Sequence, residues 1–152
     1  MTILQKLINA MLQRIEAVPV PQQELDDFLM QNQIRLCPEH YQFILDYGNS
    51  PFLIHEFANL SFDEFKDYYS DKELLPDETL PEHYDYVGCD FSNDTLCIDP
   101  NTQKIHTFGY GKANKDGFYY GGLSELLFYC LFRETYRTKC FDTIQYNIPI
   151  MD

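Results

Sequence analysis

Apolar and polar residues alternate through the middle of the chain in three short runs. The runs are Tyr84–Cys89, Thr95–Asp99 and Lys104–Tyr110. In the second run Leu96 and Ile98 share one face, while smaller or polar residues share the other. A period of two residues is typical of half-buried antiparallel strands. The pattern therefore predicts an antiparallel meander over Tyr84–Tyr110, in which Asp99–Thr102, with proline second, has the composition of a turn.

Apolar residues recur at helical spacing on either side of this meander. Helices are predicted to begin after Thr2, at Pro21, at Pro38, after Ser61 and near Leu123. The first is expected to end near Glu16 and the third at Tyr47, with Gly48 as a left-handed C-cap. The fourth has a capping-box pattern that ends in Glu64, and its aromatic residues are expected to face inward. The last is apolar almost all round as far as Phe132, which predicts a buried helix.

Four further segments complete the expected fold. Pro51–Phe57 has the composition of a strand, and Leu74–His83, with two prolines, is expected to be a loop. Gly109–Gly122 is glycine-rich and is interpreted as a mobile loop with a short strand at Phe118–Tyr120. Thr143–Ile150 alternates weakly and is expected to be an edge strand. Together these elements predict an α+β fold, with a central antiparallel sheet and helices packed at one face and at both ends.

Acidic residues are concentrated in the same middle part of the chain. The 152 residues carry a formal net charge of −13 and suffice for one domain over 1–152. Between Glu56 and Asp99 thirteen acidic residues stand against two lysines, a net charge of −11. A field of that sign repels nucleic acid and anionic lipid and favours a basic partner. An acidic surface can also serve solubility alone, so the charge by itself does not decide the function.

No targeting or anchoring segment is visible in the sequence. Apolar runs are far shorter than the ~20 residues of a membrane helix, and the amphipathic N-terminus lacks the basic start of an export signal. The five cysteines have no repeated spacing and are expected as small buried residues in a reducing compartment. We therefore expect a cytoplasmic protein, and the oligomeric state is left open.

Two pairs of residues have the spacing of a metal site. Cys37 and His40 form a C-x-x-H pair, and Cys89 and Cys97 flank the first turn of the meander. A structural zinc site needs four close ligands, and neither pair has a second tight pair to complete it. Both pairs are therefore interpreted as structural, and no metal or cofactor is expected.

The first turn of the meander begins like a calcium-binding loop. Asp90, Ser92 and Asp94 occupy alternate positions, as the first ligands of such a loop do. Thr95 stands where the loop needs glycine, and Asn101 stands where it needs an acid. Closely spaced acids in a turn are interpreted here as turn formers.

One arrangement of residues is a candidate for nucleophilic catalysis. Cys97, His106 and Asp99 could face one another across adjacent strands as nucleophile, base and orienting group. No strained elbow or oxyanion hole accompanies Cys97, and a cysteine inside a sheet normally belongs to the core. The absence of a credible catalytic cluster favours protein binding over turnover of a small molecule.

Several motifs resemble those of the SUKH superfamily. The matching segments are Cys37–Asn49 (CPEHYQFILDYGN), Val87–Asp99 (VGCDFSNDTLCID), Lys104–Phe108 and Leu123–Leu127. They are similar to the family's first conserved helix, its hairpin, the next strand and the closing helix, in the expected order. The resemblance covers about residues 37–132, and the helices within 2–30 carry no matching motif. Asn93 replaces the family's usual glycine in the hairpin turn, and Cys37 replaces the leucine before its proline.

The resemblance implies an α+β domain without catalytic residues. Many bacterial members are similar to immunity proteins, which bind and neutralise a polymorphic toxin, often a nuclease. The expected partner is therefore a basic toxin domain, neutralised by covering its active surface. The expected partner-binding residues are acids of the fourth helix, of the loop after it and of the first turn of the meander: Asp63, Glu64, Asp67, Asp71, Glu73, Asp77, Glu78, Asp90 and Asp94.

Two other functions stay open at this point. The chain could be a regulatory scaffold of the same fold, as eukaryotic members of the family are, with a partner that is not a toxin. A Cys- and His-dependent enzyme or metal protein would instead use Cys97 and His106. A toxin gene beside this one favours immunity, and the contact between Cys97 and His106 in a structure tests the third reading.

Overall fold

The fold comes from a computed structural model that describes residues 1–55, 58–71, 80, 83–90, 95–109, 112–118 and 121–138. For residues 90, 109, 112–118 and 138 it describes the backbone alone. The predicted strand Thr143–Ile150, and most of the predicted loop Leu74–His83, lie outside the described residues.

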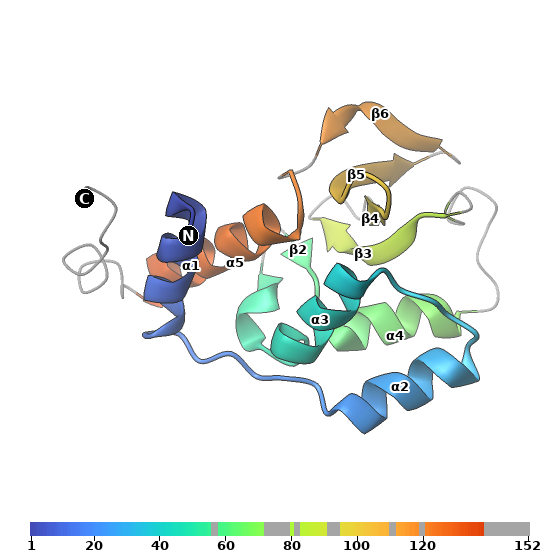
Figure 1. The fold of residues 1–152 in the computed structure, drawn as a ribbon, viewed down its shortest axis with the longest axis horizontal. Coiled ribbons are helices and arrows are strands. Elements are labelled where there is room, and N and C mark those ends of the chain that lie inside the picture. The colour runs from blue at the N-terminus through green and yellow to red at the C-terminus, as the bar shows by residue number, and fades with distance from the viewer. Residues whose placement is uncertain are drawn as a thin grey trace.

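A single antiparallel sheet forms the centre of the molecule, and its strands follow one another in chain order (Figure 1). The described strands are β1 Ile54–His55, β2 Ala58–Asn59, β3 Asp85–Asp90, β4 Thr95–Asp99, β5 Lys104–Gly109 and β6 Lys112–Phe118. The predicted meander is confirmed as β3, β4 and β5. Its second turn is confirmed as well, because the Gln103 N–H donates to the Asp99 carbonyl at 2.8 Å.

Five described helices surround the sheet, and the predicted α+β class is confirmed. They are α1 Ile3–Leu12, α2 Gln22–Gln31, α3 Pro38–Tyr47, α4 Phe62–Ser70 and α5 Leu123–Thr138. The Thr2 hydroxyl caps α1 by accepting from the Gln5 N–H at 3.1 Å, and Ser61 caps α4 in the same way at 3.2 Å. The helix α1 ends at Leu12, earlier than its apolar stripe predicts.

One face of the sheet and the helices α3 and α5 line a mainly aliphatic core, which α1 joins by packing on α5. We call this core the aliphatic cluster. It contains Ile8, Met11, Ile15, Phe43, Phe52, Leu53, Ala58, Leu60, Val87, Leu96, Ile98, Ile105, Leu126, Leu127, Cys130 and Leu131. Leu96, Ile98 and Ile105 supply the face of β4 and β5 and are fully buried. This is the face on which the alternating pattern places Leu96 and Ile98.

A second core joins α2, α3 and α4 to the edge of β3. We call it the aromatic cluster. Its buried residues are Val20, Leu25, Ile44, Phe62, Phe65 and Tyr86, with Phe28, Tyr41, Tyr68 and Tyr69 packed against them. Strand β2 pairs with β3 only at Cys89 and Asp90, so within the described residues no strand lies beside the other end of β3 on that edge. The helix α4 packs there and covers polar backbone that would otherwise be exposed.

Two predicted segments have a different structure. The predicted strand over Pro51–Phe57 is wrong for Pro51–Leu53, which form a 3-10 turn before the two residues of β1. The turn sends Phe52 and Leu53 into the aliphatic cluster, which consecutive strand residues could not both reach. The predicted loop at Gly109–Gly122 is wrong over Lys112–Phe118, because β6 pairs with β5 there. Because this segment is rich in glycine, its sequence predicts a loop and does not indicate the strand.

The predictions for α5 and Gly48 also need correction. The helix α5 continues past Phe132, and Phe132 is 41% exposed, so this helix is not buried all round. Its buried side is Leu126, Leu127, Cys130 and Leu131. Gly48 has φ −57° and is therefore not left-handed. A side chain at Gly48 would meet the Val20 side chain at 2.6 Å, so the glycine is required by close packing.

Candidate functional site

Helices α2 and α4 lie side by side (Figure 1), and both carry acidic residues. The Lys66 ammonium on α4 lies 3.7 Å from Glu24 on α2 and 3.4 Å from Asp63 on its own helix. We call the carboxylates of these two helices and of the α4 C-cap the acidic surface. It comprises Glu24, Asp26, Asp27, Asp63, Asp67 and Asp71. Asp27 is half-buried, and the other five are exposed.

The acids toward the end of α4 are placed against the preferences of an isolated helix, whereas Asp63 in the first turn is favoured by the helix dipole and by Lys66. Asp63, Asp67 and Asp71 are spaced four residues apart, so they form one stripe of like charge. Each such pair of like charges costs a helix about 0.2–0.5 kcal/mol. The last turn has no basic residue, and Asp71 at the C-cap faces the negative end of the helix dipole. Packing on the aromatic cluster must therefore stabilise this helix.

Tyr86 on β3 attaches α4 to the sheet through three directional contacts. Its hydroxyl donates to the Glu64 carboxylate at 2.7 Å, and its backbone N–H donates to the Tyr69 hydroxyl at 3.1 Å. The Tyr68 ring stacks on the Tyr86 ring at 3.9 Å with an interplanar angle of 2°. Burial raises the pKa of both Tyr69 and Tyr86, and the neighbouring Glu64 carboxylate raises that of Tyr86 further. Both hydroxyls stay protonated, so the Tyr86 hydroxyl keeps donating to Glu64 while the Tyr69 hydroxyl accepts from the Tyr86 N–H.

The predicted partner-binding residues fall into four groups. Asp63, Asp67 and Asp71 are exposed on the acidic surface. Glu64 is half-buried against Tyr86, so the capping box forms only from its serine side: the Ser61 N–H donates to Asn59 instead of Glu64. Asp90 ends β3, where the structure describes its backbone alone. The remaining four lie outside the described residues: Glu73, Asp77, Glu78 and Asp94.

The contribution of α2 to the acidic surface is not predicted by the sequence. Its acids lie far from Asp63 in the chain, and only the folded structure brings them beside α4. The Tyr41 hydroxyl on α3 donates to Asp26 at 2.6 Å, and the Gln23 amide donates to Asp27 at 2.8 Å. The aromatic edge contact of Phe28 with Phe62, at 6.0 Å, holds the two helices together. Acids flanking an apolar stripe that ends in Phe28 were the available signal in the sequence.

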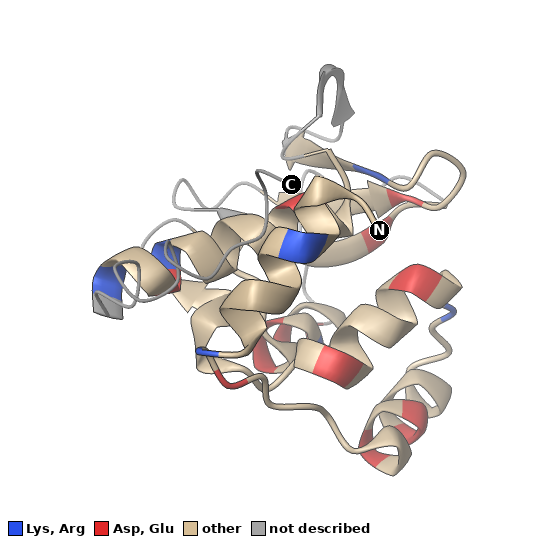
Figure 2. Cartoon of the chain, turned by 60° about the vertical axis from the view of Figure 1, so that its left-hand side comes forward, with Lys and Arg blue, Asp and Glu red and all other residues tan. Residues whose placement is uncertain are grey.

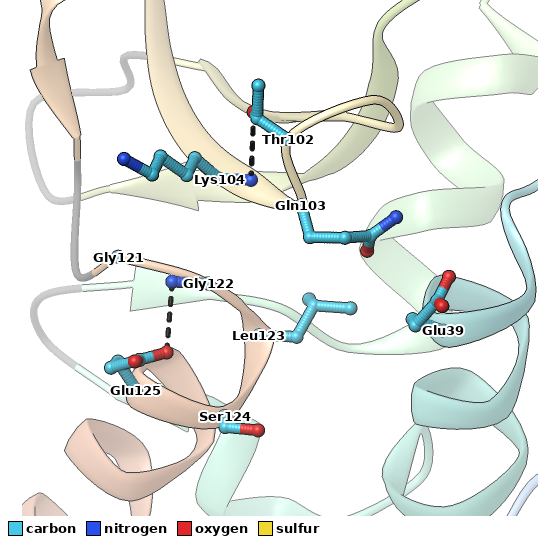
Figure 3. A pocket seen from close by; sticks show the side chains of 9 residues that line it. All are labelled: Glu39, Thr102, Gln103, Lys104, Gly121, Gly122, Leu123, Ser124 and Glu125. Carbon is cyan, nitrogen blue, oxygen red and sulfur yellow. Dashed lines mark hydrogen bonds between the residues drawn. The ribbon is translucent and has the colours of Figure 1, made fainter.

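A groove runs along the opposite side of α3. It consists of two adjoining hollows of about 380 and 320 Å³, which share Glu39, Leu123 and Ser124. The larger hollow lies between the start of α3, the β4–β5 turn and the start of α5 (Figure 3). The smaller one continues between α1, α3 and α5. A left-handed Gln103, φ 61°, shapes the turn at the mouth of the larger hollow.

Cys97 and His106 are neighbours across β4 and β5, but their contact is a structural one. The Cys97 thiol approaches the backbone carbonyl of His106 at 3.5 Å. Burial, and to a lesser extent the Asp99 carboxylate, raises the pKa of Cys97 to about 12. A thiol that holds its proton so firmly is a poor nucleophile at neutral pH. Nothing in this geometry supports the arrangement of a catalytic triad.

The side chains of Cys37 and His40, the pair with C-x-x-H spacing, have separate surroundings. His40 is fully buried with its ring edge-on to Phe65 at 5.8 Å, and burial lowers its pKa to about 4. The Cys37 sulfur instead lies 4.0 Å from the Gln103 side chain. Cys89 pairs with Thr95 in the sheet, and Cys97 pairs with Tyr86. In the described part of the chain, no three His, Cys, Asp or Glu side chains gather closely enough to hold a metal ion.

Comparisons with protein-family models, with curated proteins and with solved structures found no match. Within the described residues, no helix has both the length and the apolar character needed to cross a membrane.

Proposed function

We propose that this protein is a non-enzymatic binding protein of the immunity type, resembling the SUKH superfamily, that neutralises a basic toxin domain. The observation that carries the proposal is the gathering of α2 and α4 carboxylates into one acidic surface. Within the two helices six acidic residues stand against Lys66. The surface is exposed and is held on a packed aromatic core.

The physical basis of the proposed interaction is electrostatic complementarity. A nuclease or another toxin that acts on nucleic acid must offer a basic surface to phosphate groups. An acidic surface attracts that basic surface at long range and speeds the encounter, and it competes with the nucleic acid for the same side chains. Neutralisation then requires only that the immunity protein occupies the basic surface of the toxin. It needs no catalytic residue for this.

The stripe on α4 supports the proposal over a role in solubility alone. Solubility requires net charge anywhere on the surface, whereas Asp67 and Asp71 are aligned toward the negative end of the dipole of their own helix, at a cost to its stability. An arrangement that lowers helix stability is expected where the aligned charges meet a partner.

Co-expression with toxin domains encoded beside this gene tests the proposal. The wild-type protein should restore growth of a host that expresses its cognate toxin and should be recovered in complex with it. The reversal variant D26K/D63K/D67K/D71K should fail to restore growth. A matched four-site reversal elsewhere, K6E/R14E/R133E/R137E, should still protect. Capture of a basic partner without any rescue would show a regulatory scaffold instead, and failure to bind any basic partner would refute the proposal.

A further inference from the structure

We propose that the groove beside α3 receives an extended, basic segment of the same partner, with an arginine or lysine beside Glu39 or Asp46. This inference rests on the proposed function, because it assigns a second contact to the basic protein that the acidic surface attracts. It concerns a different side of α3 and a different set of residues.

The groove has an apolar floor and a polar rim, as peptide-binding grooves commonly do. Ile8, Phe43 and Leu127 lie along its narrower half, and Leu123 lies at the junction of the two hollows. In Figure 3 the Leu123 side chain points toward Glu39 across the larger hollow. An apolar side chain of a bound segment would therefore have a surface to cover at the junction.

The negative charge of the groove's rim indicates that the bound segment is basic. Glu39 and Asp46 lie seven residues apart on α3, which places them on the same side of the helix. Neither carboxylate forms an ion pair with any residue that the structure describes. The smaller hollow is lined by these two acids and by no basic residue. Lys104 lines the far end of the larger hollow, and its side chain runs away from Glu39 (Figure 3).

The length and the hydrogen-bonding groups of the groove suit an extended chain. Seven residues of helix span about 10 Å, at 1.5 Å per residue. Three extended residues cover about the same distance, at roughly 3.3 Å each. Amide side chains of Gln5 and Gln42 line the groove between the two acids. Gln42 donates one amide N–H to Asp46 at 2.9 Å, and Gln5 donates one to Asn9 at 3.4 Å. This leaves each amide a second N–H and its carbonyl oxygen for the backbone of a segment laid along α3. A basic side chain at either end of such a segment would reach Glu39 or Asp46.

Titration with short peptides tests the groove without the natural partner. The probe is acetyl-Arg-Leu-Arg-Leu-amide, the control peptide is acetyl-Glu-Leu-Glu-Leu-amide, and the readout is the backbone amide NMR spectrum of the full chain at low salt. The basic peptide should shift the amides of Gln42, Tyr47, Ser124 and Leu127, and the acidic peptide should leave them unchanged. Shifts confined to α2 and α4, or no shifts, would overturn the inference.

Two variants sharpen the result. E39Q/D46N keeps the shape of the rim and removes its charge, and it should weaken binding of the basic peptide by about tenfold. S124W fills the junction of the two hollows from an exposed position, and it should abolish the shifts. The matched variant D63N/D67N, which removes two charges from α4, should bind the peptide within about twofold of wild type. The amide spectrum of each variant reports directly whether it is folded.

The same variants separate this inference from the proposed function. If D26K/D63K/D67K/D71K loses protection against the toxin while E39Q/D46N and S124W protect and bind as wild type does, the acidic surface stands and the groove is refuted. If no basic partner exists but the peptide binds in the groove as described, the immunity proposal fails while the peptide site stands.

Discussion

The two halves of the molecule differ in both their interior and their surface. The half built on α1 and α5 packs mainly aliphatic side chains, and its two helices carry three basic and two acidic residues. The half built on α2 and α4 packs aromatic side chains, and its helices carry six acidic residues and one basic residue. Figure 2 shows this division, with acids gathered over α2, α3 and α4 and basic residues on α1 and the far part of α5.

The difference shows how a like-charged surface can be held rigid. Aliphatic packing is non-directional and tolerates small rotations of a helix. The contacts of Tyr86 with Glu64, Tyr68 and Tyr69 are directional, and they fix the rotation of α4 about its axis. The aspartates on the outer side of α4 are thereby held in a fixed direction, although their mutual repulsion opposes the helix.

The largest expected effect comes from emptying the centre of the aromatic cluster. Phe65 is 1% exposed and contacts the rings of Phe28, His40 and Tyr69. Phe65→Ala should lower the free energy of unfolding by about 3–5 kcal/mol, because it removes buried area and leaves a cavity. Urea unfolding monitored by circular dichroism measures the change. The matched change Phe132→Ala, at a position 41% exposed, should cost less than about 1 kcal/mol. Equal costs at the two sites would contradict the assigned core.

The next effect is a loss of stability in acid that depends on His40. Burial lowers the pKa of His40 from 6.5 to about 4, so between those pH values the unfolded chain binds more protons than the folded one. Stability should therefore fall as the pH falls from 6.5 to 4, by about 3 kcal/mol from this residue. Burial raises the pKa of Asp85, which acts in the opposite direction.

Unfolding midpoints in urea at pH 7, 5.5 and 4 measure the acid effect. His40→Leu removes the titrating group, and its stability should decline less over this range than that of wild type. The imidazole Nδ1 has no hydrogen-bond partner in the described structure, so the leucine leaves no polar group unpaired. A wild-type protein and a leucine variant with parallel pH profiles would show that His40 is not buried in its neutral form.

A smaller effect is expected from the hydrogen bond between Tyr86 and Glu64. Tyr86→Phe keeps the stacked ring and removes the hydroxyl that donates to the half-buried carboxylate. It should cost about 1–2 kcal/mol, because the bond is charge-assisted and its acceptor loses a partner. Tyr136→Phe, at a position 71% exposed, is the control and should have almost no effect. A double-mutant cycle with Glu64→Gln should give a coupling energy above about 0.5 kcal/mol, and additive costs would rule out the bond.

Local patterns in the sequence predict most of the fold. The alternation at Leu96 and Ile98 predicts the central strands, and Thr2 and Ser61 predict two helix starts through their side-chain caps. The failures have local causes. The apolar composition of Pro51–Phe57 is compatible with a strand as well as with a turn. Pro51–Leu53 form a turn because the turn buries both Phe52 and Leu53.

The candidate site was only partly visible in the sequence, because it depends on contacts between distant segments. Asp63, Asp67 and Asp71 follow from the helical period. The pairing of Glu64 with Tyr86 joins residues 22 positions apart, and no local pattern indicates it. The approach of Glu24 to Lys66 is likewise a result of tertiary packing. Helical wheels of single segments cannot show which acids of two different helices meet.

The most direct test of the central claim is the rate of association with the basic partner captured by co-expression, measured by stopped flow at several salt concentrations. At low salt D26K/D63K/D67K/D71K should associate at least about tenfold more slowly than wild type, and its rate should depend less on salt. The variant K6E/R14E/R133E/R137E should associate no more slowly than wild type. Equal rates and equal salt dependence for the acidic-surface variant and wild type would show that the partner is not recognised through α2 and α4.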